Sequence, residues 1–400
     1  MIPVSDFLEI ASEHTSDSDV RSRAPARFAG SSAAAPVVIW NVCMHCNMTC
    51  PHCYAAAVSS PSPTDLTTAE ACDLLEQLAA CGVRVVIFSG GEPLLRPDLF
   101  ELLALASALG ISPQLSSNGV CIDERRAERL AASGVAYVGI SIDGIPSFND
   151  DYRGLDGGHA AAVRGLRCAK AAGMRTGLRT TLTRRNADQI EAMIALAGDL
   201  AADRFYLSHL LYSGRGFHVA DDDLARAAVR AILERVFEIA ESLRKAQSEL
   251  RIVTGSNDSD GVFLLRWIER RYGAGAAARV RALLLARGGN SAGEKILNID
   301  SRGRVHPDQF WRSAVLGDLR QQKFAAILEH PLREQLRRRL DFIQGRCAEC
   351  AERVLCRGSH RERALAHHRD AWASDPACVM EDAEIGVGTA PGERVASEVA

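Results

Sequence analysis

The stretch CNMTCPHC at residues 46–53 decides the interpretation of this sequence, because it places three cysteines in the pattern C-x3-C-x2-C. It follows an apolar segment, residues 37–42, which predicts a buried β-strand. Three closely spaced thiolates, Cys46, Cys50 and Cys53, can hold three irons of a [4Fe–4S] cluster and leave the fourth iron open for chemistry. Zinc is the alternative, since Cys43, His45 or His52 lies close enough in sequence to supply a fourth ligand.

Beyond this loop, apolar strands alternate with amphipathic helices. The sequence predicts further strands at 84–89, 113–117, 135–142, 174–182 and 204–209, and helices at 67–81, 97–109, 124–132, 159–172 and 188–200. Alternation at this spacing requires parallel strands joined by crossover helices. We therefore expect the α/β class and a partial (βα)6 TIM-like barrel, with an open doubly wound sheet as the alternative.

A second group of cysteines, in the pattern C-x2-C-x5-C-x21-C, lies near the end of the chain. Its members are Cys347, Cys350, Cys356 and Cys378. Four thiolates can enclose a second four-iron cluster completely, and a structural zinc ribbon fits the same spacing. Twelve cysteines in a chain that opens without an export signal favour metal or redox chemistry over disulfides, so we expect a cytoplasmic protein.

Composition and pattern together suggest how the chain is divided. With 400 residues, 47% of them hydrophobic, and a net charge of -3, the chain is globular, and we expect neither nucleic-acid binding nor a membrane span. Two long helices, at 221–249 and 262–287, flank a polar loop at 254–261, and a hairpin follows at 296–307. The expected units are an N-terminal lead-in (1–36), the partial barrel (37–220), a helical bridging segment (221–295), a C-terminal auxiliary cluster domain (296–382) and a disordered tail (383–400).

Taken together, residues 37–210 resemble the radical S-adenosylmethionine (SAM) superfamily. Gly90, Gly91 and Glu92 follow the second expected strand and are similar to the GGE motif that holds the amino group of SAM in that family. Two glycines at the carboxyl end of a strand permit close backbone approach to a ligand. The resemblance implies a [4Fe–4S] cluster on the first cysteine group and SAM as the second cofactor.

Polar residues at the ends of the other strands complete the SAM site that the resemblance implies. They are Ser117 and Asn118 after the third strand, Ser141 and Asp143 after the fourth, and Arg153 beyond them. Arg153 is similar to an arginine that pairs with the SAM carboxylate, a task for which a guanidinium is well suited. His52 stands where the family more often has an aromatic residue beside adenine. The alternative for each is an ordinary strand-end or turn residue.

The second cysteine group resembles the SPASM and twitch branch of the superfamily, which implies an auxiliary [4Fe–4S] cluster. We expect one such cluster and not two, because no cysteine lies between Cys168 and Cys347. Asp308 stands about where an early SPASM cysteine would be. The remaining cysteines are interpreted as structural or loop thiols: Cys43, Cys72, Cys81, Cys121 and Cys168.

Within this branch, several segments resemble the radical SAM enzymes of haem d1 biosynthesis. They are WNVCMHCNMTC at 40–50, FYLSHL at 205–210, TGSNDSDGV at 254–262, GGNS at 288–291 and VHPDQFW at 305–311. The resemblance implies that a 5′-deoxyadenosyl radical removes propionate side chains from a didecarboxysirohaem-type tetrapyrrole. Its expected partners are this carboxylate-rich substrate and a small electron-transfer protein, a ferredoxin or flavodoxin.

Other features bear on the substrate. Residues 333–369 carry ten arginines against five acidic residues, which suggests an acidic substrate or, more simply, a solvated helical face. The loops at 254–261 and 288–291 are expected to line the site. Candidate contacts to the iron or carboxylates of the substrate are His209, His218, His306 and His360. A peptide-modifying SPASM enzyme and a non-catalytic iron–sulfur or zinc scaffold are the alternative functions.

Overall fold

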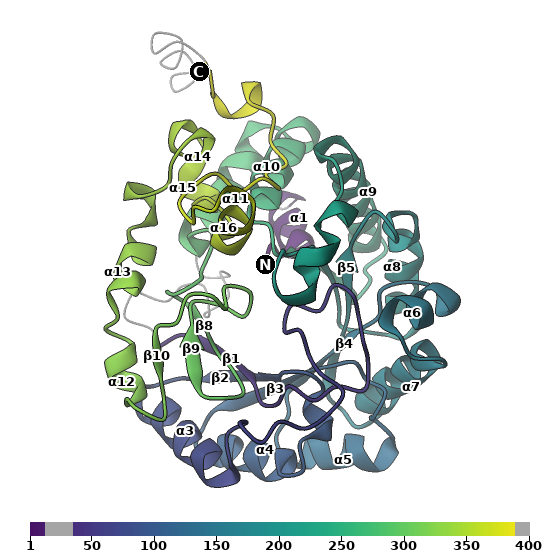
Figure 1. Cartoon of the computed structure of the whole chain (residues 1–400). Coiled ribbons are helices and arrows are strands. Elements are labelled where there is room, and N and C mark those ends of the chain that lie inside the picture. The colour runs from purple at the N-terminus through teal and green to yellow at the C-terminus, as the bar shows by residue number, and fades with distance from the viewer. Residues whose placement is uncertain (13–34, 389–400) are drawn as a thin grey trace.

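A curved parallel sheet with helices on its outer face forms the main body of the protein (Figure 1). The computed structural model describes residues 1–12 and 35–388. Its parallel strands, paired in chain order, are β1 (Val37–Asn41), β2 (Val85–Ser89), β3 (Ser112–Ser117), β4 (Tyr137–Ser141), β5 (Arg175–Leu182), β6 (Arg204–His209) and β7 (Arg251–Gly255). The covering helices are α3 (Thr68–Ala80), α4 (Leu99–Ala108), α5 (Glu124–Ala132), α7 (Gly158–Ala171) and α8 (Ile190–Asp199). The expected α/β architecture is confirmed.

The helices begin and end where local sequence signals place them. Thr67 caps α3, because its side chain accepts a hydrogen bond from the backbone N–H of Glu70 while the Glu70 carboxylate accepts one from the backbone of Thr67. Asp123 caps α5 in the same manner, through the backbone N–H of Arg126. The covering helices α4, α7 and α8 begin without a side-chain cap. Because the crossover helices join parallel strands, every strand delivers its carboxyl end to the same edge.

The sheet extends beyond the six strands that the sequence predicts. β7 continues it at one edge. The sequence predicted no strand here, and it placed the last two residues of β7 in the polar loop expected from residue 254. At the other edge β8 (Ile296–Ile299) pairs in parallel with β1, and β9 (Arg304–His306) and β10 (Gly317–Asp318) follow antiparallel. In the described part of the chain, these ten strands form one sheet in the order β10-β9-β8-β1-β2-β3-β4-β5-β6-β7. The expected hairpin is thus present, but it is continuous with the barrel sheet.

Helices between β6 and β8 pack at one end of this sheet. They are α9 (Arg226–Lys245), α10 (Ser259–Tyr272) and α11 (Ala274–Arg287). Residues 262–287 are helical, as expected, and Gly273, at φ +86°, divides them between α10 and α11. The cluster of aspartates at 221–223 does not cap α9, which begins after Ala225 without a side-chain cap.

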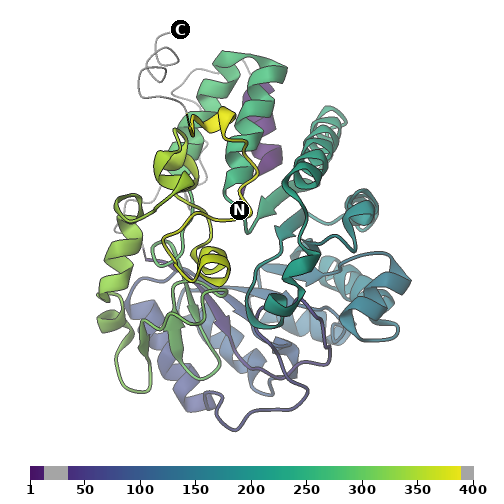
Figure 2. The same cartoon turned by 45° about the horizontal axis from the view of Figure 1, so that its top comes forward.

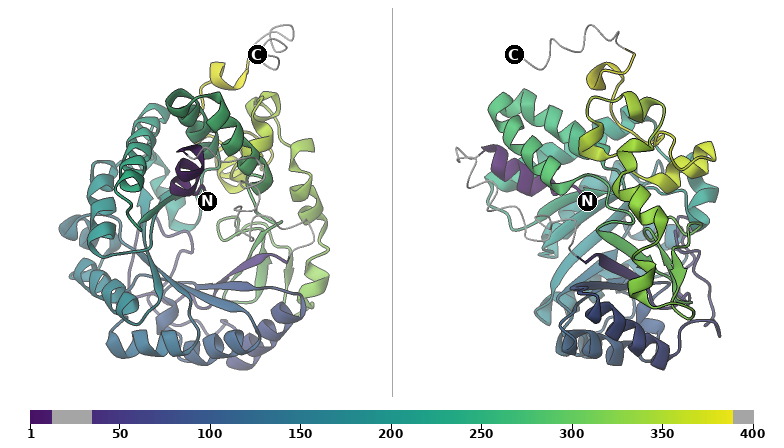
Figure 3. Two further views of the ribbon diagram at one scale, coloured as in Figure 1. Left: turned by 180° about the vertical axis from the view of Figure 1, so that it is seen from behind. Right: turned by 90° about the vertical axis from the view of Figure 1, so that its left-hand side faces the viewer.

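The first residues belong to the folded core and are not only a lead-in. Helix α1 (Val4–Ser12) packs against α9, α11 and β7, and Ile2 exchanges two backbone hydrogen bonds with Thr254. In Figure 3 this helix, in purple, lies beside the green α10–α11 pair. Residues 13–34, the rest of the expected lead-in, lie outside the described residues.

The C-terminal segment folds back over the carboxyl edge of the barrel (Figure 2). Its short helices are α12 (Phe324–Ile327), α13 (Pro331–Arg337), α14 (Arg346–Glu349), α15 (Arg353–Cys356) and α16 (Arg361–His368). Arg363 on α16 donates hydrogen bonds to the carbonyls of Leu210 and Ser256, which follow β6 and β7. The C-terminal segment is therefore anchored at the ends of β6 and β7, on the same carboxyl edge that carries the predicted SAM contacts.

The expected disordered tail is wrong for residues 383–388. They include the 3-10 turn η5 (Ala383–Ile385), and the side chain of Ile385 is buried. Residues 389–400 lie outside the described residues. No helix among the described residues combines the length and the apolar character that a membrane crossing requires.

Candidate active site at the carboxyl ends of the strands

The first cysteine group lies in the loop after β1, at the carboxyl edge of the sheet. The backbone N–H of Cys46 donates to the carbonyl of Val58 at 2.8 Å, and Cys53 closes a turn onto the carbonyl of Cys50 at 3.3 Å. The loop therefore returns on itself, which brings its three thiols near one another.

Burial affects the ionisation of two of these thiols. It raises the pKa of Cys46 to about 11 and also raises that of Cys50, and both are further affected by neighbouring cysteines of the group. A buried thiol gives up its proton readily only when a metal or cation compensates the charge. Three neighbouring thiols, with Cys50 buried and the other two half-buried, fit a three-cysteine iron–sulfur cluster. Cys43 is buried with a pKa raised to about 12, and its thiol faces the carbonyl of Glu92, as expected of a structural cysteine.

Arg215 holds this loop from a distant part of the chain and was missed in the sequence. Its Nε donates to the carbonyl of Cys50 at 2.8 Å, and its NH1 donates to the carbonyl of Ala57 at 2.6 Å. Its backbone N–H donates to the carbonyl of Cys53 at 2.9 Å. Arg215 lies in the 3-10 segment η3 (Gly214–Asp222), where Gly214, at φ +57°, leaves no room for a Cβ beside the backbone of Cys53. The signal that could have revealed it is the Gly-Arg-Gly triplet after the last predicted strand.

Glu92 connects the ends of β2 and β3. Its side chain is fully buried and accepts hydrogen bonds from the Ser117 hydroxyl at 2.8 Å, the Asn118 backbone N–H at 2.8 Å and the Leu94 N–H at 3.2 Å. The structure therefore brings together Glu92, Ser117 and Asn118, as the sequence predicts. A carboxylate can accept about four hydrogen bonds, so Glu92 retains one acceptor position for a ligand such as an ammonium group.

Gly90 shows why two glycines precede this carboxylate. It adopts φ +142°, and a Cβ there would collide with the carbonyl oxygen of Cys43. Gly91 donates its N–H to that carbonyl at 2.8 Å, and Glu92 donates its own to the carbonyl of His45 at 2.7 Å. The two glycines permit the GGE segment to pack directly on the cysteine loop, which is a contact within the protein and not only a space for a ligand.

Asp143, Arg153 and His52 form one buried charged group. The carboxylate of Asp143 accepts from NH1 of Arg153 at 2.6 Å and lies 3.1 Å from Nε2 of His52. These partners hold the pKa of Asp143 below its usual range despite the opposing effect of burial. Arg153, in α6 (Pro146–Arg153), keeps its charge because Cys50 and Asp143 raise its pKa against the effect of burial. The predicted SAM contacts Asp143 and Arg153 thus pair with one another beside the first cysteine group.

The ring of His52 is held in place by stacking. It lies parallel to the ring of Tyr152, with 4.9 Å between centroids and 4° between planes. One face of the imidazole is covered by Tyr152, and Nδ1 is buried without a hydrogen-bond partner among the described residues. An unpartnered buried nitrogen suits a site that awaits a ligand. A role beside adenine stays a prediction.

Ser141 is half-buried at the end of β4, and its neighbour across the sheet is Arg179 on β5. Arg179 is a second residue that the sequence analysis missed. Its guanidinium passes over Gly139, which has no side chain to block it, and NH1 donates to the hydroxyl of Ser116 at 2.7 Å. A guanidinium inside the curve of the sheet can bind a carboxylate. The signal was an arginine at alternate positions of a strand whose other face is apolar.

The four cysteines of the second group also converge. Cys347, Cys350 and Cys356 are each affected electrostatically by Cys378, and Cys356 is affected by all three others. Burial raises the pKa values of Cys347, Cys350 and Cys356, that of Cys350 to about 11. Among the described residues, no group of three or more His, Cys, Asp and Glu side chains is arranged as a site for a single metal ion. Four neighbouring thiols, of which Cys347 is buried and the other three are half-buried, supply the donor set that a four-iron cluster requires.

The loops expected to line the substrate site are buried where the barrel packs against the C-terminal segment. Asp258 accepts hydrogen bonds from Arg287 and from Asn290, both at 3.0 Å. Asn257 donates to the carbonyl of Ala377 at 2.7 Å, directly before Cys378. The loops at 254–261 and 288–291 thus position the second cysteine group relative to the barrel, and their role in lining a substrate site stays a prediction.

The candidate histidines separate into distinct environments. His209 lies 2.8 Å from a carboxylate oxygen of Asp260, and His306 is bonded to the carbonyl of Ala314 at 2.9 Å, so both are satisfied buried residues. His218 is exposed on η3. His360 is buried, and its Nδ1 lies 3.7 Å from Asp308, beyond hydrogen-bonding distance. His360 is the candidate whose ring nitrogen is left without a hydrogen-bond partner among the described residues.

The arginine-rich segment does not form an open basic surface. Four of its ten arginines are buried: Arg333, Arg339, Arg361 and Arg363. Several others bind carboxylates, such as Arg357 with Glu294 at 2.7 Å. The charge excess of this segment therefore acts mainly inside the protein.

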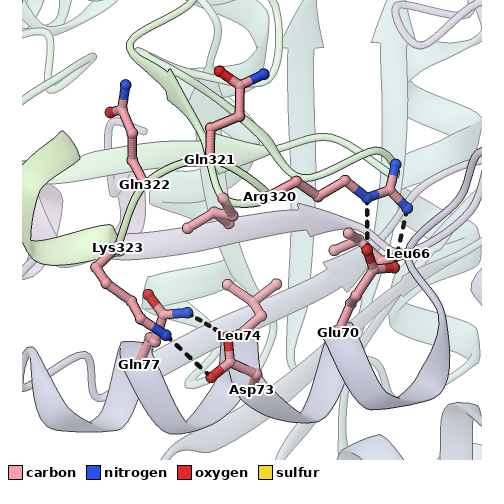
Figure 4. A pocket seen from close by; sticks show the side chains of 10 residues that line it. Leu66, Glu70, Asp73, Leu74, Gln77, Arg320, Gln321, Gln322 and Lys323 are labelled. Carbon is pink, nitrogen blue, oxygen red and sulfur yellow. Dashed lines mark hydrogen bonds and ion pairs between the residues drawn. The ribbon is translucent and has the colours of Figure 1, made fainter.

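A cavity of about 480 Å³ lies away from the predicted site residues, between α3 and the segment from β10 to α12. Figure 4 shows that ion pairs cross it, from Arg320 to Glu70 and from Lys323 to Asp73. None of the cysteines or predicted SAM contacts lines it. This cavity is part of the packing between the β10–α12 segment and α3, and the candidate active site lies at the strand ends.

Comparisons with known proteins agree with this site. The family model described as the radical SAM superfamily matches residues 40–197. The pre-heme d1 synthase of Dinoroseobacter shibae is 42% identical over 359 residues, which is 88% of each chain. The Fe-coproporphyrin III synthase of Methanosarcina barkeri is 37% identical over 357 residues, 88% of this chain and 89% of its own.

Solved structures show the same fold. Streptococcus suis SuiB bound to S-adenosylmethionine matches with a TM-score of 0.65 and 16% identity, over 87% of this chain and 78% of its own. Native anSMEcpe with bound AdoMet matches with a TM-score of 0.67 and 19% identity, over 86% of this chain and 93% of its own. With the cysteine loop, the GGE segment and a relative of 42% identity over nearly the full length, the chain belongs to the radical SAM superfamily.

Proposed function

We propose that this protein is a tetrapyrrole-modifying radical SAM enzyme that removes propionate side chains from a didecarboxysirohaem-type substrate. The observation that carries the proposal is the 42% identity to a pre-heme d1 synthase across both the barrel and the C-terminal cysteine region. A likeness over 88% of both chains extends to the elements that would enclose a substrate, and not only to the SAM-binding half.

The residues of the barrel would bind and orient SAM. Cys46, Cys50 and Cys53 would hold the first [4Fe–4S] cluster, and the remaining acceptor position of Glu92 is suited to the amino group of SAM. Arg153 or Arg179 offers a guanidinium for its carboxylate. When bound, the clusters supply one-electron chemistry: the first cleaves SAM to methionine and a 5′-deoxyadenosyl radical, and the auxiliary cluster can accept an electron.

The substrate would lie over the strand ends, between the first cysteine group and α16. Hydrogen abstraction from a propionate arm gives 5′-deoxyadenosine and a carbon radical on that arm. Cleavage of the bond between arm and ring then releases the arm as an unsaturated acid and leaves one unpaired electron on the ring. Transfer of that electron to an acceptor completes the step. The second cysteine group, anchored to the barrel mouth through Arg363, would hold that acceptor.

Electrons for SAM cleavage must come from outside the chain. A ferredoxin or flavodoxin is the proposed donor, because such proteins deliver single electrons at low potential. The electron donor and a fully enclosed cluster on Cys347, Cys350, Cys356 and Cys378 are both parts of this proposal.

The experiment that tests the function is an anaerobic incubation of reconstituted, reduced protein with SAM and didecarboxysirohaem. We expect about eight irons per chain, formation of 5′-deoxyadenosine, and a tetrapyrrole whose mass reports lost propionates. The matched control is the Cys46→Ala, Cys50→Ala, Cys53→Ala variant, which should retain half of the iron and produce no 5′-deoxyadenosine. Stoichiometric zinc in the second group would overturn the auxiliary cluster.

Fe-coproporphyrin III formation is the second candidate, because a synthase of that product is 37% identical over 88% of this chain. Both candidates act on a tetrapyrrole, and the same incubation separates them. A product that retains four propionates would favour the second candidate. A tetrapyrrole that neither binds nor changes mass, while a short peptide is modified, would favour a peptide-modifying enzyme, in line with the PqqA peptide cyclase of Xanthomonas campestris at 28% identity.

A further inference from the structure

Arg361 is a buried cation that makes no ion pair with a carboxylate among the described residues, although the charge of Asp375 favours its protonated form. It begins α16, and its side chain is 1% exposed. Its NH1 donates to the carbonyls of Ala371 at 3.0 Å and Ala373 at 2.8 Å, and its NH2 donates to the carbonyl of Gly358. Its Nε is buried without an acceptor among the described residues. A buried charge held only by neutral dipoles is unfavourable unless an anion lies nearby.

Two other arginines of the same segment have the close carboxylate partner that Arg361 lacks. Arg363, two residues further along α16, binds Asp375 through two hydrogen bonds of 2.7 and 2.9 Å. Arg338 pairs with Asp341 at 2.8 Å on the surface. The absence of an ion pair distinguishes Arg361 from these two arginines.

The position of Arg361 relates it to the second cysteine group. Gly358, whose carbonyl it binds, lies two residues after Cys356. Ala373, bound on the other side, precedes Ser374, whose hydroxyl accepts the backbone N–H of Cys347 at 3.0 Å. Burial lowers the pKa of the Arg361 guanidinium. The charges of Cys347 and Cys356 act in the opposite direction and favour its protonated form. Arg361 thus lies between two of the four thiols.

We propose that Arg361 is the counter-charge of the auxiliary cluster and that its unpartnered Nε–H donates to a sulfur of that cluster. The inference rests on the proposed function, which places a four-iron cluster on this cysteine group. A [4Fe–4S] cluster with four thiolates carries about two negative charges when oxidised and one more after it accepts an electron. A fixed cation and a hydrogen-bond donor stabilise the reduced form more than the oxidised form. Arg361 therefore raises the reduction potential of the auxiliary cluster and makes it a better electron acceptor.

The test is a redox titration of the auxiliary cluster, followed by electron paramagnetic resonance. It is performed on full-length protein in which Cys46, Cys50 and Cys53 are replaced by alanine, so that the signal comes from one cluster. We expect R361Q to shift the reduction equilibrium at least tenfold toward the oxidised form, equivalent to 59 mV for a one-electron couple. R361K keeps the charge and should retain most of the potential. The matched control R338Q should leave the potential unchanged, because Arg338 is exposed and Asp341 already balances its charge.

A structural role would give a different result. If Arg361 serves the cluster, R361Q should lower the thermal unfolding midpoint of the cluster-loaded protein but not that of the metal-free protein. Equal loss of stability in both forms, or an unchanged potential in fully loaded R361Q, would overturn the inference. Loss of the cluster from R361Q while the metal-free fold stays intact would support it. Failure of the proposed function would give a different observation, because the unsubstituted protein would then bind no second cluster.

Discussion

Glu362 on α16 shows how the surroundings of one side chain decide its charge. It is next to Arg361 in sequence, yet it faces Asp308 and Ser313, and its Oε2 is buried without a partner among the described residues. Burial, with a smaller effect from Asp308, raises its pKa to about 8. Asp308, expected near the position of an early SPASM cysteine, is itself buried and accepts the backbone N–H groups of Phe310 and Trp311. A protonated Glu362 avoids two adjacent negative charges.

We predict that Glu362 makes stability depend on pH. Between its ordinary pKa of 4.5 and about 8, the folded protein keeps the proton on Glu362 while the unfolded chain has lost it. Stability therefore falls as pH rises through this window and levels off above it. Glu362→Gln removes the titrating group, so its apparent unfolding midpoint should fall less between pH 5 and 8 than that of the unsubstituted protein. The exposed Glu334→Gln is the control, and parallel pH profiles for Glu362→Gln and the parent would contradict the prediction.

At the scale of elements, η3 acts as a clamp on the first cysteine loop. Its Arg215 binds the backbone on both sides of the cysteines, and Ser213, just before it, donates to the carbonyl of Phe310 at 2.6 Å. Phe310 in turn lies edge-on to Tyr54, with 5.3 Å between ring centroids. The cysteine loop, η3 and the segment after β9 thus support one another, although long stretches of sequence separate them.

We predict that Arg215→Ala reduces iron in the first cysteine group. Two charge-assisted hydrogen bonds, each worth about 1.5–3 kcal/mol, hold the loop in its conformation, and their loss leaves it free to move. Iron and sulfide counts after anaerobic reconstitution and gel filtration should fall toward half, because the second cysteine group is not affected. Arg184→Ala is the matched control, since that arginine is exposed and pairs with Asp222 in the same segment at 3.4 Å. Full iron content in Arg215→Ala would rule out the clamp.

At the scale of the whole molecule, the two ends of the chain close the fold. Helix α1 fills the space among α9, α11 and β7, and α16 fastens the C-terminal cysteine region to the ends of β6 and β7. The contacts of α1 and the β8–β1 pairing join segments more than two hundred residues apart, and the contacts of α16 join segments more than one hundred residues apart. Long-range closure of this kind makes the barrel, the helical segment and the auxiliary region dependent on one another.

We predict that Leu8→Ala in α1 destabilises the whole protein and not only its N-terminus. Leu8 is fully buried, and removing a buried leucine side chain costs about 2–5 kcal/mol. The apparent unfolding midpoint, followed by circular dichroism under anaerobic conditions, should fall in a single transition. Glu9→Ala is the control, because Glu9 is exposed and its ion pair with Arg251 is worth about 0–1 kcal/mol. A separate early transition in Leu8→Ala would show that α1 unfolds on its own.

The sequence by itself determined the elements that local patterns encode. Hydrophobic periodicity located β1 to β6 and their helices, because side-chain burial on one face follows from spacing along the chain. Parallel strands end at one edge, so the sequence also predicted that Glu92, Ser117 and Asn118 meet. The short spacings within each cysteine group predicted that its thiols lie close together. Cys378 is the exception, because it is far along the chain from the other three cysteines of its group.

Only the tertiary structure decided which distant segments touch. Three contacts depend on how the sheet curves. They are the pairing of β8 with β1, the hydrogen bonds of Arg215 to the cysteine loop, and the contact of the Arg179 guanidinium with Gly139. The arginines near the second cysteine group look alike in sequence, and Arg361 and Arg363 are both buried, yet only Arg363 is hydrogen-bonded to a carboxylate. Charge compensation depends on the distances between charged groups in space, and these distances do not follow from spacing along the chain.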